Sequence, residues 1–138
     1  MFSTTADHAL RAVLFLAQQP GRVASSDEIA QAIGAPRNYL SKTLYELRKA
    51  GVVESVAGRQ GGFLLAVPGD RLSIADVVGH FEAPSESARC LLGDRPCDAK
   101  NPCVAHEKWA SITESYRVAL EETTIADLLA GTPRPRRR

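Results

Sequence analysis

The sequence predicts a mainly α-helical fold with a small β-hairpin, arranged as a winged helix-turn-helix head and a long C-terminal helix. Two short helical patterns, near residues 26–33 and 36–50, are separated only by a tight turn. Two β-rich runs, VVESV and FLLAV, then flank the glycine-rich stretch AGRQGG, as is typical of a hairpin. A longer helical pattern follows over residues 102–122. A hairpin directly after a tight helix pair predicts the wing of a winged helix.

The head is expected to begin with a helix over residues 4–18. Thr4 and Asp7 have the three-residue spacing of a helix-capping pair, and apolar residues follow at helical intervals. Pro20 and Gly21 end this helix.

The helix pair itself carries clear start and stop residues. Ser25 and Glu28 have the spacing of a capping box, and Gly34 ends the helix that they open. Pro36 suits the first position of the next helix, which Gly51 ends. The inner stripe of this next helix is predicted to be Leu40, Leu44 and Leu47.

Two further helices and a long loop are expected after the hairpin. Ser73 and Asp76 cap a fourth helix running to about Glu82. Residues 83–101 form a loop that is too long for a passive connection, which favours a functional role. Pro102 is expected to start the longest helix, and residues 124–131 form a last short helix.

The second helix of the predicted pair carries polar and basic side chains on its outer face. The major groove of B-DNA admits one helix, and the first turns of that helix can reach base edges. A solvated polar face of an ordinary helical domain is the alternative; the adjacent wing favours DNA binding. The predicted DNA-binding residues are Arg37, Asn38, Ser41 and Lys42 toward bases, Arg48 and Lys49 toward phosphates, Arg59 and Gln60 at the wing tip, and Tyr45 on the same helix face.

All three cysteines lie in one segment, with the spacing C-x6-C-x5-C and a histidine three positions after the last. Three thiolates and one imidazole could hold either a tetrahedral zinc ion or an iron–sulfur cluster. The wide gaps and the long loop favour a cluster; zinc, free cysteines or a redox-labile pair remain alternatives. The candidate ligands are Cys90, Cys97, Cys103 and His106, whereas His8 and His80 lack such companions and are interpreted as structural or surface residues.

Length and composition exclude several classes of protein. The 138 residues suit one domain, or a small head with one long appended element. No apolar run approaches the ~20 residues that span a bilayer, and the N-terminus lacks a basic region, so a cytoplasmic protein without a membrane partner is expected. The net charge of +1 is too small to indicate nucleic-acid binding by itself. With no phosphate-binding glycine loop or nucleophile elbow, an enzyme or a small-molecule substrate is not expected.

Several of these stretches together resemble one known family, the small winged-helix regulators that include the iron–sulfur cluster assembly regulator IscR and the nitric-oxide-sensing repressor NsrR. The resemblance covers nearly the whole chain. It is carried by TTADHALRAVLFLA, by the residues from SSDEIAQAIG to GRQGGFLLA, by LSIADVVGHFE, by the three cysteines and by TTIADLL.

The resemblance implies a homodimer whose long C-terminal helix crosses its partner, and a cluster bound by the three cysteines. In the assembly-regulator type a histidine matching His106 completes a 2Fe-2S cluster. In the nitric-oxide type a carboxylate matching Asp7 of the partner subunit completes a 4Fe-4S cluster. The sequence HEKW after Cys103 favours 2Fe-2S, although Asp7 is also explained as a first-turn residue that the helix dipole stabilises. The first cysteine gap departs from both types, in which it is shorter, and Ser41 stands where the assembly regulator has an acidic residue.

The protein is predicted to be a dimeric transcription regulator that binds a double-stranded DNA operator, and a repressor is expected. Its affinity is expected to depend on an iron–sulfur cluster that senses iron, redox state or nitric oxide. The alternative is a regulator of the same fold with structural zinc or a thiol switch. The expected parts are a winged-helix DNA-binding domain (1–82), a cysteine-bearing loop (83–101), a dimerisation helix with a C-terminal helix (102–131) and a basic tail (132–138).

Overall fold

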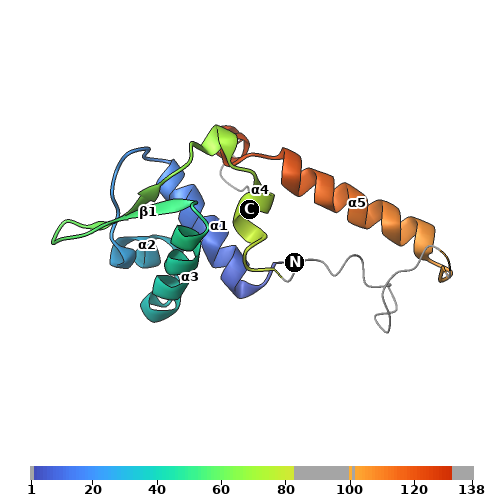
Figure 1. Ribbon diagram of the computed structural model, residues 1–138, viewed down its shortest axis with the longest axis horizontal. Coiled ribbons are helices and arrows are strands. Elements are labelled where there is room, and N and C mark those ends of the chain that lie inside the picture. Colours follow the sequence, from blue (N-terminus) through green and yellow to red (C-terminus); the bar gives the residue numbers. More distant parts are fainter. Residues whose placement is uncertain (1, 83–99, 101, 132–138) are drawn as a thin grey trace, which may run out of the picture.

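The structure is a computed structural model and describes residues 2–82, 100 and 102–131. These residues form a mainly helical fold with one two-stranded antiparallel sheet (Figure 1). In chain order the elements are α1 (Thr4–Ala17), α2 (Ser26–Ile33), α3 (Arg37–Lys49), β1 (Val53–Val56), β2 (Gly62–Leu65), a 3₁₀ helix η1 (Gly69–Arg71), α4 (Ile74–Val78), α5 (His106–Glu122) and α6 (Ile125–Ala130). The predicted mainly helical fold with a hairpin is therefore confirmed.

The caps of the helix pair follow from local side-chain chemistry. The Ser25 hydroxyl accepts a hydrogen bond from the Glu28 N–H at 3.1 Å and so starts α2. The second half of the predicted capping box is replaced by an ion pair, because the Glu28 carboxylate binds Arg22 at 2.6 Å. Gly34 ends α2 in the left-handed conformation, with φ of 71°, which other residues rarely adopt.

Three predicted helix boundaries are corrected. The cap of α1 is Ser3, whose hydroxyl accepts from the Ala6 N–H, and Thr4 is the first helical residue. Pro36 is the residue before α3, not its first residue. The longest helix, α5, begins at His106 instead of Pro102, because the chain first makes a turn at residues 104–105.

The fourth and last helices begin with matching capping boxes. In α4 the Ser73 hydroxyl and the Asp76 carboxylate each accept the other's backbone N–H, and α4 ends at Val78, short of the predicted Glu82. Thr124 and Asp127 repeat this arrangement at α6. Hydrogen bonds from Thr124, mainly from its backbone N–H and then from its side chain, hold the pKa of Asp127 below its ordinary value. The two cap residues also meet as an isolated β-bridge.

The wing is a hairpin that a third stretch of chain extends. β1 and β2 pair from Val53 with Leu65 to Val56 with Gly62. Ala24, just before α2, exchanges two backbone hydrogen bonds with Phe63, at 2.9 and 2.7 Å. A Cβ atom at Gly62 would lie 2.2 Å from the Ala24 carbonyl oxygen, so only glycine allows this close approach.

The apolar core lies between α1, α3 and α6. Leu40, Leu44 and Leu47 of α3 are fully buried, as predicted for its inner stripe, and they share one cluster with Val13 of α1 and Ile125 of α6. By contrast, α5 contains no buried residue and extends away from the head (Figure 1). Among the described residues, no helix is both long and apolar enough to cross a membrane.

Substitution of Ile125 by alanine tests whether α6 belongs to this core. Ile125 is fully buried, so we expect the free energy of unfolding to fall by about 3 kcal/mol from lost burial and a residual cavity. Denaturant unfolding of the metal-free protein measures this. The control is Val104→Ala at a fully exposed position, which should change stability by less than about 0.5 kcal/mol. Equal stability of both variants would contradict the assigned packing.

Candidate functional site

The buried leucine stripe of α3 determines which of its side chains face solvent. With Leu40, Leu44 and Leu47 against the core, the opposite face of α3 is open. The structure brings together on this exposed face all seven predicted DNA-binding residues of the helix: Arg37, Asn38, Ser41, Lys42, Tyr45, Arg48 and Lys49.

Contacts within the protein already engage part of this face. Arg37 forms an ion pair with Asp27 of α2 at 2.6 Å, and both side chains are more than half exposed. The Ser41 hydroxyl donates to the Arg37 carbonyl oxygen at 3.1 Å, which leaves its lone pairs free to accept. The Lys49 ammonium lies 5.7 Å from the centre of the Tyr45 ring. Exposed contacts of this kind are weak, so phosphate or base groups can replace them at little cost.

The other two predicted DNA-binding residues, Arg59 and Gln60, lie in the turn that joins β1 to β2. Both are exposed, and the turn is closed by a hydrogen bond from the Gly61 N–H to the Gly58 carbonyl at 3.0 Å. Figure 1 shows this tip projecting well beyond the helices. The tip can therefore contact a surface that also touches α3 without moving the head.

Tyr39 is a residue of α3 that the sequence reasoning missed. Its hydroxyl forms a hydrogen bond with the Thr5 hydroxyl of α1, and the His8 ring packs edge-on against its ring with centroids 5.7 Å apart. The Tyr39 carbonyl accepts from the Thr43 hydroxyl at 3.2 Å. An aromatic residue between polar positions was the only available sequence signal, because its partners lie on another helix.

Of the four predicted cluster ligands, the structure describes Cys103 and His106; Cys90 and Cys97 lie outside the described residues. The His106 N–H donates to the Cys103 carbonyl at 3.1 Å, so one turn of chain separates the two residues at the start of α5. Both are half-buried and line one hollow of about 520 Å³ formed by residues 102–108. Within the described part, no three histidine, cysteine or carboxylate side chains form a metal-binding group.

The alternative ligand Asp7 lies elsewhere in the chain. Its carboxylate accepts a hydrogen bond from Arg11 at 2.8 Å on the exposed side of α1. In Figure 1 the first turn of α1 is well separated from the first turn of α5. Within one chain, this arrangement does not bring Asp7 next to Cys103.

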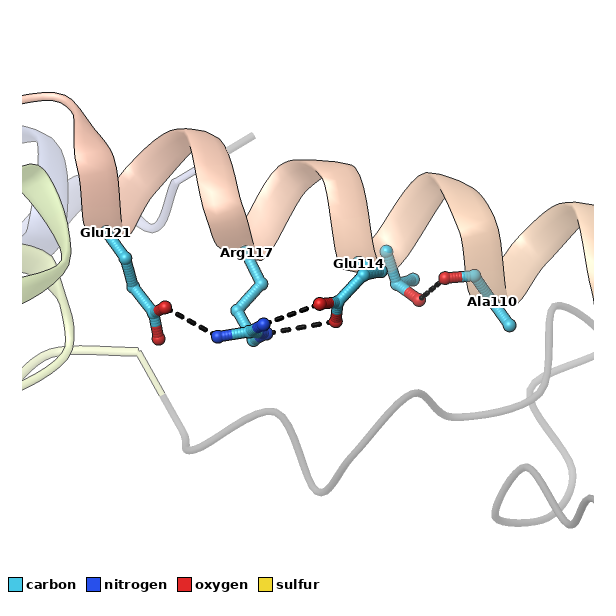
Figure 2. A network of polar contacts seen from close by, with 5 residues as sticks. Ala110, Glu114, Arg117 and Glu121 are labelled. Atoms are coloured by element: carbon cyan, nitrogen blue, oxygen red, sulfur yellow. Dashed lines mark hydrogen bonds and ion pairs between the residues drawn. The ribbon is translucent and has the colours of Figure 1, made fainter.

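The long helix α5 has two different faces. On one, Arg117 binds Glu114 and Glu121, each at 2.5 Å (Figure 2). The hydrogen bond from Arg117 holds the pKa of Glu114 below its ordinary value, and both carboxylates raise the pKa of Arg117. On the opposite face Ile112 and Tyr116 are large apolar side chains left exposed, 59% and 39%. Partial burial, and then the Glu82 carboxylate, raise the pKa of Tyr116.

The curated proteins that resemble this chain over most of its length include transcriptional regulators. A protein of Aquifex aeolicus, provisionally assigned as an HTH-type transcriptional regulator, is 38% identical over 94% of this chain and 91% of its own. The HTH-type transcriptional repressor NsrR of Streptomyces coelicolor is 31% identical over 94% and 88%.

Two solved structures also superpose over most of their length. CymR, the global cysteine regulator of B. subtilis, has a TM-score of 0.81 at 29% identity and covers 96% of this chain and 98% of its own. IscR of T. potens has a TM-score of 0.75 at 27% identity, with 98% and 93% covered. Residues 2–131 match the family Rrf2, described as iron-dependent transcriptional regulator. The chain therefore belongs to the Rrf2 family of winged-helix, DNA-binding transcriptional regulators.

Proposed function

We propose that this protein is a dimeric regulator whose promoter affinity is controlled by an iron–sulfur cluster held by Cys90, Cys97, Cys103 and His106. The observation that carries the proposal is the placement of Cys103 and His106 in one hollow at the start of α5. Two cysteines precede them in the same segment, so the donor set of three thiolates and one imidazole fits such a cluster. The iron-dependent family and the likeness to IscR and NsrR support the same reading.

His106 is the proposed fourth ligand, which favours a 2Fe-2S over a 4Fe-4S cluster. It lies one turn from Cys103, whereas Asp7 is engaged with Arg11 and separated from α5 in its own chain. Ligation by Asp7 of the partner subunit would require that ion pair to open. When bound, the cluster would supply iron that oxidants, nitric oxide or iron limitation can alter. The residues around it would then convert its loss into a different DNA affinity.

The proposed DNA contacts are the exposed face of α3 and the wing tip. Arg37, Asn38, Ser41 and Lys42 occupy the first turns of α3, where base edges are within reach. Arg48 and Lys49 in the last turn are proposed to bind phosphates, with Arg59 and Gln60 in the adjacent minor groove. Tyr45 lies between the two groups on the same open face.

The proposed dimer surface is the apolar face of α5. None of the 17 residues of α5 is buried in its own chain, although Leu120 near its end packs against Ile74 and Val78. Most helices depend on more tertiary packing than this. Trp109, Ile112 and Tyr116 share one face at helical spacing, and the ion pairs of Arg117 occupy the opposite face. A second copy placing its own α5 here would bury both apolar faces, as the solved relatives' overall likeness supports.

A structural zinc ion or a thiol switch is the second candidate. The likeness to CymR, a cysteine regulator, supports this second candidate. Within the described residues Cys103 forms no disulfide, so its thiol is available for either role. Both of these states are colourless, so absorbance separates them from a cluster.

Anaerobic purification followed by absorption spectroscopy and metal analysis tests the cluster. We expect a brown protein with matched iron and sulfide, because three thiolates hold the iron. Cys103→Ser should abolish the colour, and His106→Ala should shift the spectrum or speed cluster loss. His80→Ala, at an exposed histidine, is the matched control and should change neither. A colourless wild-type protein with about one zinc per chain would refute the cluster.

Salt titration of DNA binding tests the proposed phosphate contact of Arg48. A protein that lacks one phosphate contact releases fewer counterions when it binds DNA. Arg48→Ala should therefore weaken binding to all DNA sequences. It should also reduce the slope of log affinity against log salt by about 1. Arg71→Ala, on η1 outside the proposed surface, should leave the slope unchanged. An unchanged slope for Arg48→Ala would remove this residue from the interface.

Light scattering tests the dimer surface. The metal-free wild-type protein should have twice the 14.9 kDa mass of one chain, and Ile112→Glu should shift it toward the monomer by placing a charge in an apolar interface. Glu114→Ala on the opposite face of α5 is the control and should remain dimeric. A dimeric Ile112→Glu protein would place the interface elsewhere.

A further inference from the structure

The first turn of α1 is bound at its start to the end of the α4 segment. The Ser3 backbone N–H donates to the Glu82 carboxylate at 2.8 Å. Glu82 directly precedes the segment that carries Cys90 and Cys97 in the sequence. The N-terminus of α1 is thus connected to the part of the chain that leads into the cysteine segment.

The same turn is bound to the recognition helix α3 through Tyr39. The Tyr39 and Thr5 hydroxyls share a hydrogen bond, and the His8 and Tyr39 rings pack in a T-shaped pair. Nδ1 of His8 is buried and has no hydrogen-bond partner among the described residues. Among the described residues, the Tyr39 side chain is therefore held by its hydroxyl contact with Thr5 and by the neighbouring His8 ring.

Movement of Tyr39 would be transmitted into α3. Its carbonyl accepts from the hydroxyl of Thr43, which is only 2% exposed and lies next to the buried Leu44. Tyr39 is also flanked by Asn38, one of the proposed base-reading residues. A shift of the first turn of α1 would therefore reach the base-reading turn through the Tyr39 side chain, in addition to the apolar contact between α1 and α3.

We propose that Tyr39 is a positioning residue that couples the first turn of α1 to the recognition helix. In this role the Thr5–Tyr39 contact stabilises one orientation of α3, and the contact would differ in strength between the cluster-loaded and the cluster-free protein. This inference rests on the proposed cluster-dependent function, because it concerns how that dependence reaches the DNA-binding surface. It assigns to Tyr39 no contact with the cluster or with DNA.

Tyr39→Phe tests the inference because it removes only the hydroxyl and keeps the ring against His8. The measurement is the dissociation constant for one DNA duplex, selected in vitro with the loaded wild-type protein, before and after iron removal by a chelator. We expect the ratio of the two constants to move toward one by roughly fivefold, the effect of one hydrogen bond of ordinary net strength. Thr5→Val should do the same, and the double variant should be no worse than either, because both lose one contact.

Two further readouts separate positioning from damage. The visible absorbance per chain of the loaded variant and the thermal unfolding of the metal-free variant should match the wild type. Tyr45→Phe is the matched control, since Tyr45 lies on the proposed DNA face of α3 and makes no contact with α1. It should change both dissociation constants by the same factor and leave their ratio intact.

The outcomes distinguish this inference from the proposed function. If the loaded and metal-free wild-type proteins bind equally, the cluster-dependent function fails and the inference fails with it. If the wild type discriminates and Tyr39→Phe keeps the full ratio, the inference alone fails. An equal loss of affinity in both states would instead make Tyr39 a DNA contact and would also overturn the coupling role.

Discussion

The burial of the leucine stripe of α3 is the constraint on which the rest of the head depends. Leu40, Leu44 and Leu47 can pack on α1 in only one rotation of the helix, and that rotation determines which side chains remain outside. The polar residues of α3 gain their common orientation from this apolar contact, and not from interactions among themselves. The wing is fixed to the same core, since Val53 of β1 is buried there and Phe63 is hydrogen-bonded to Ala24 before α2.

Features that depend on neighbouring residues could be predicted from the sequence. The Ser73 cap, the helix end at Gly34 and the helix start at residue 124 depend on hydrogen bonds within four residues and were correctly predicted. The α1 cap was predicted one residue late, because Ser3, Thr4 and Thr5 all suit a cap. In the structure the Ser3 hydroxyl forms the cap, and its backbone N–H donates to Glu82, which is distant in the sequence. Pro102 fitted a helix start equally well, yet the chain turns once more before α5 begins.

In the candidate site, too, features set by neighbouring residues could be predicted, and features set by distant residues could not. Exposure of the nine predicted DNA-binding residues follows from helical periodicity and hairpin geometry, both of which are local. The role of Tyr39 could not be predicted, because its hydroxyl partner is on α1 and its ring neighbour is a histidine that had been interpreted as structural. Cys103 and His106 lie one turn of chain apart, which their spacing in the sequence already requires, and their role as ligands stays a prediction. The relation of Asp7 to the cysteines is a tertiary question, and spacing carries no information on it.

The pairing of Ser73 with Thr124 has a consequence for the architecture of the chain. The Ile74 N–H donates to the Thr123 carbonyl and the Ile125 N–H to the Leu72 carbonyl, so the starts of α4 and α6 are held together. α4 itself packs on the head, with Val77 buried in the core. The chain between the end of α4 and the start of α6 is therefore an excursion whose two ends the head holds close together. The entropy of closing such a loop changes only slowly with its length. Segments of different length and chemistry can thus be exchanged within the excursion while the DNA-reading scaffold stays the same.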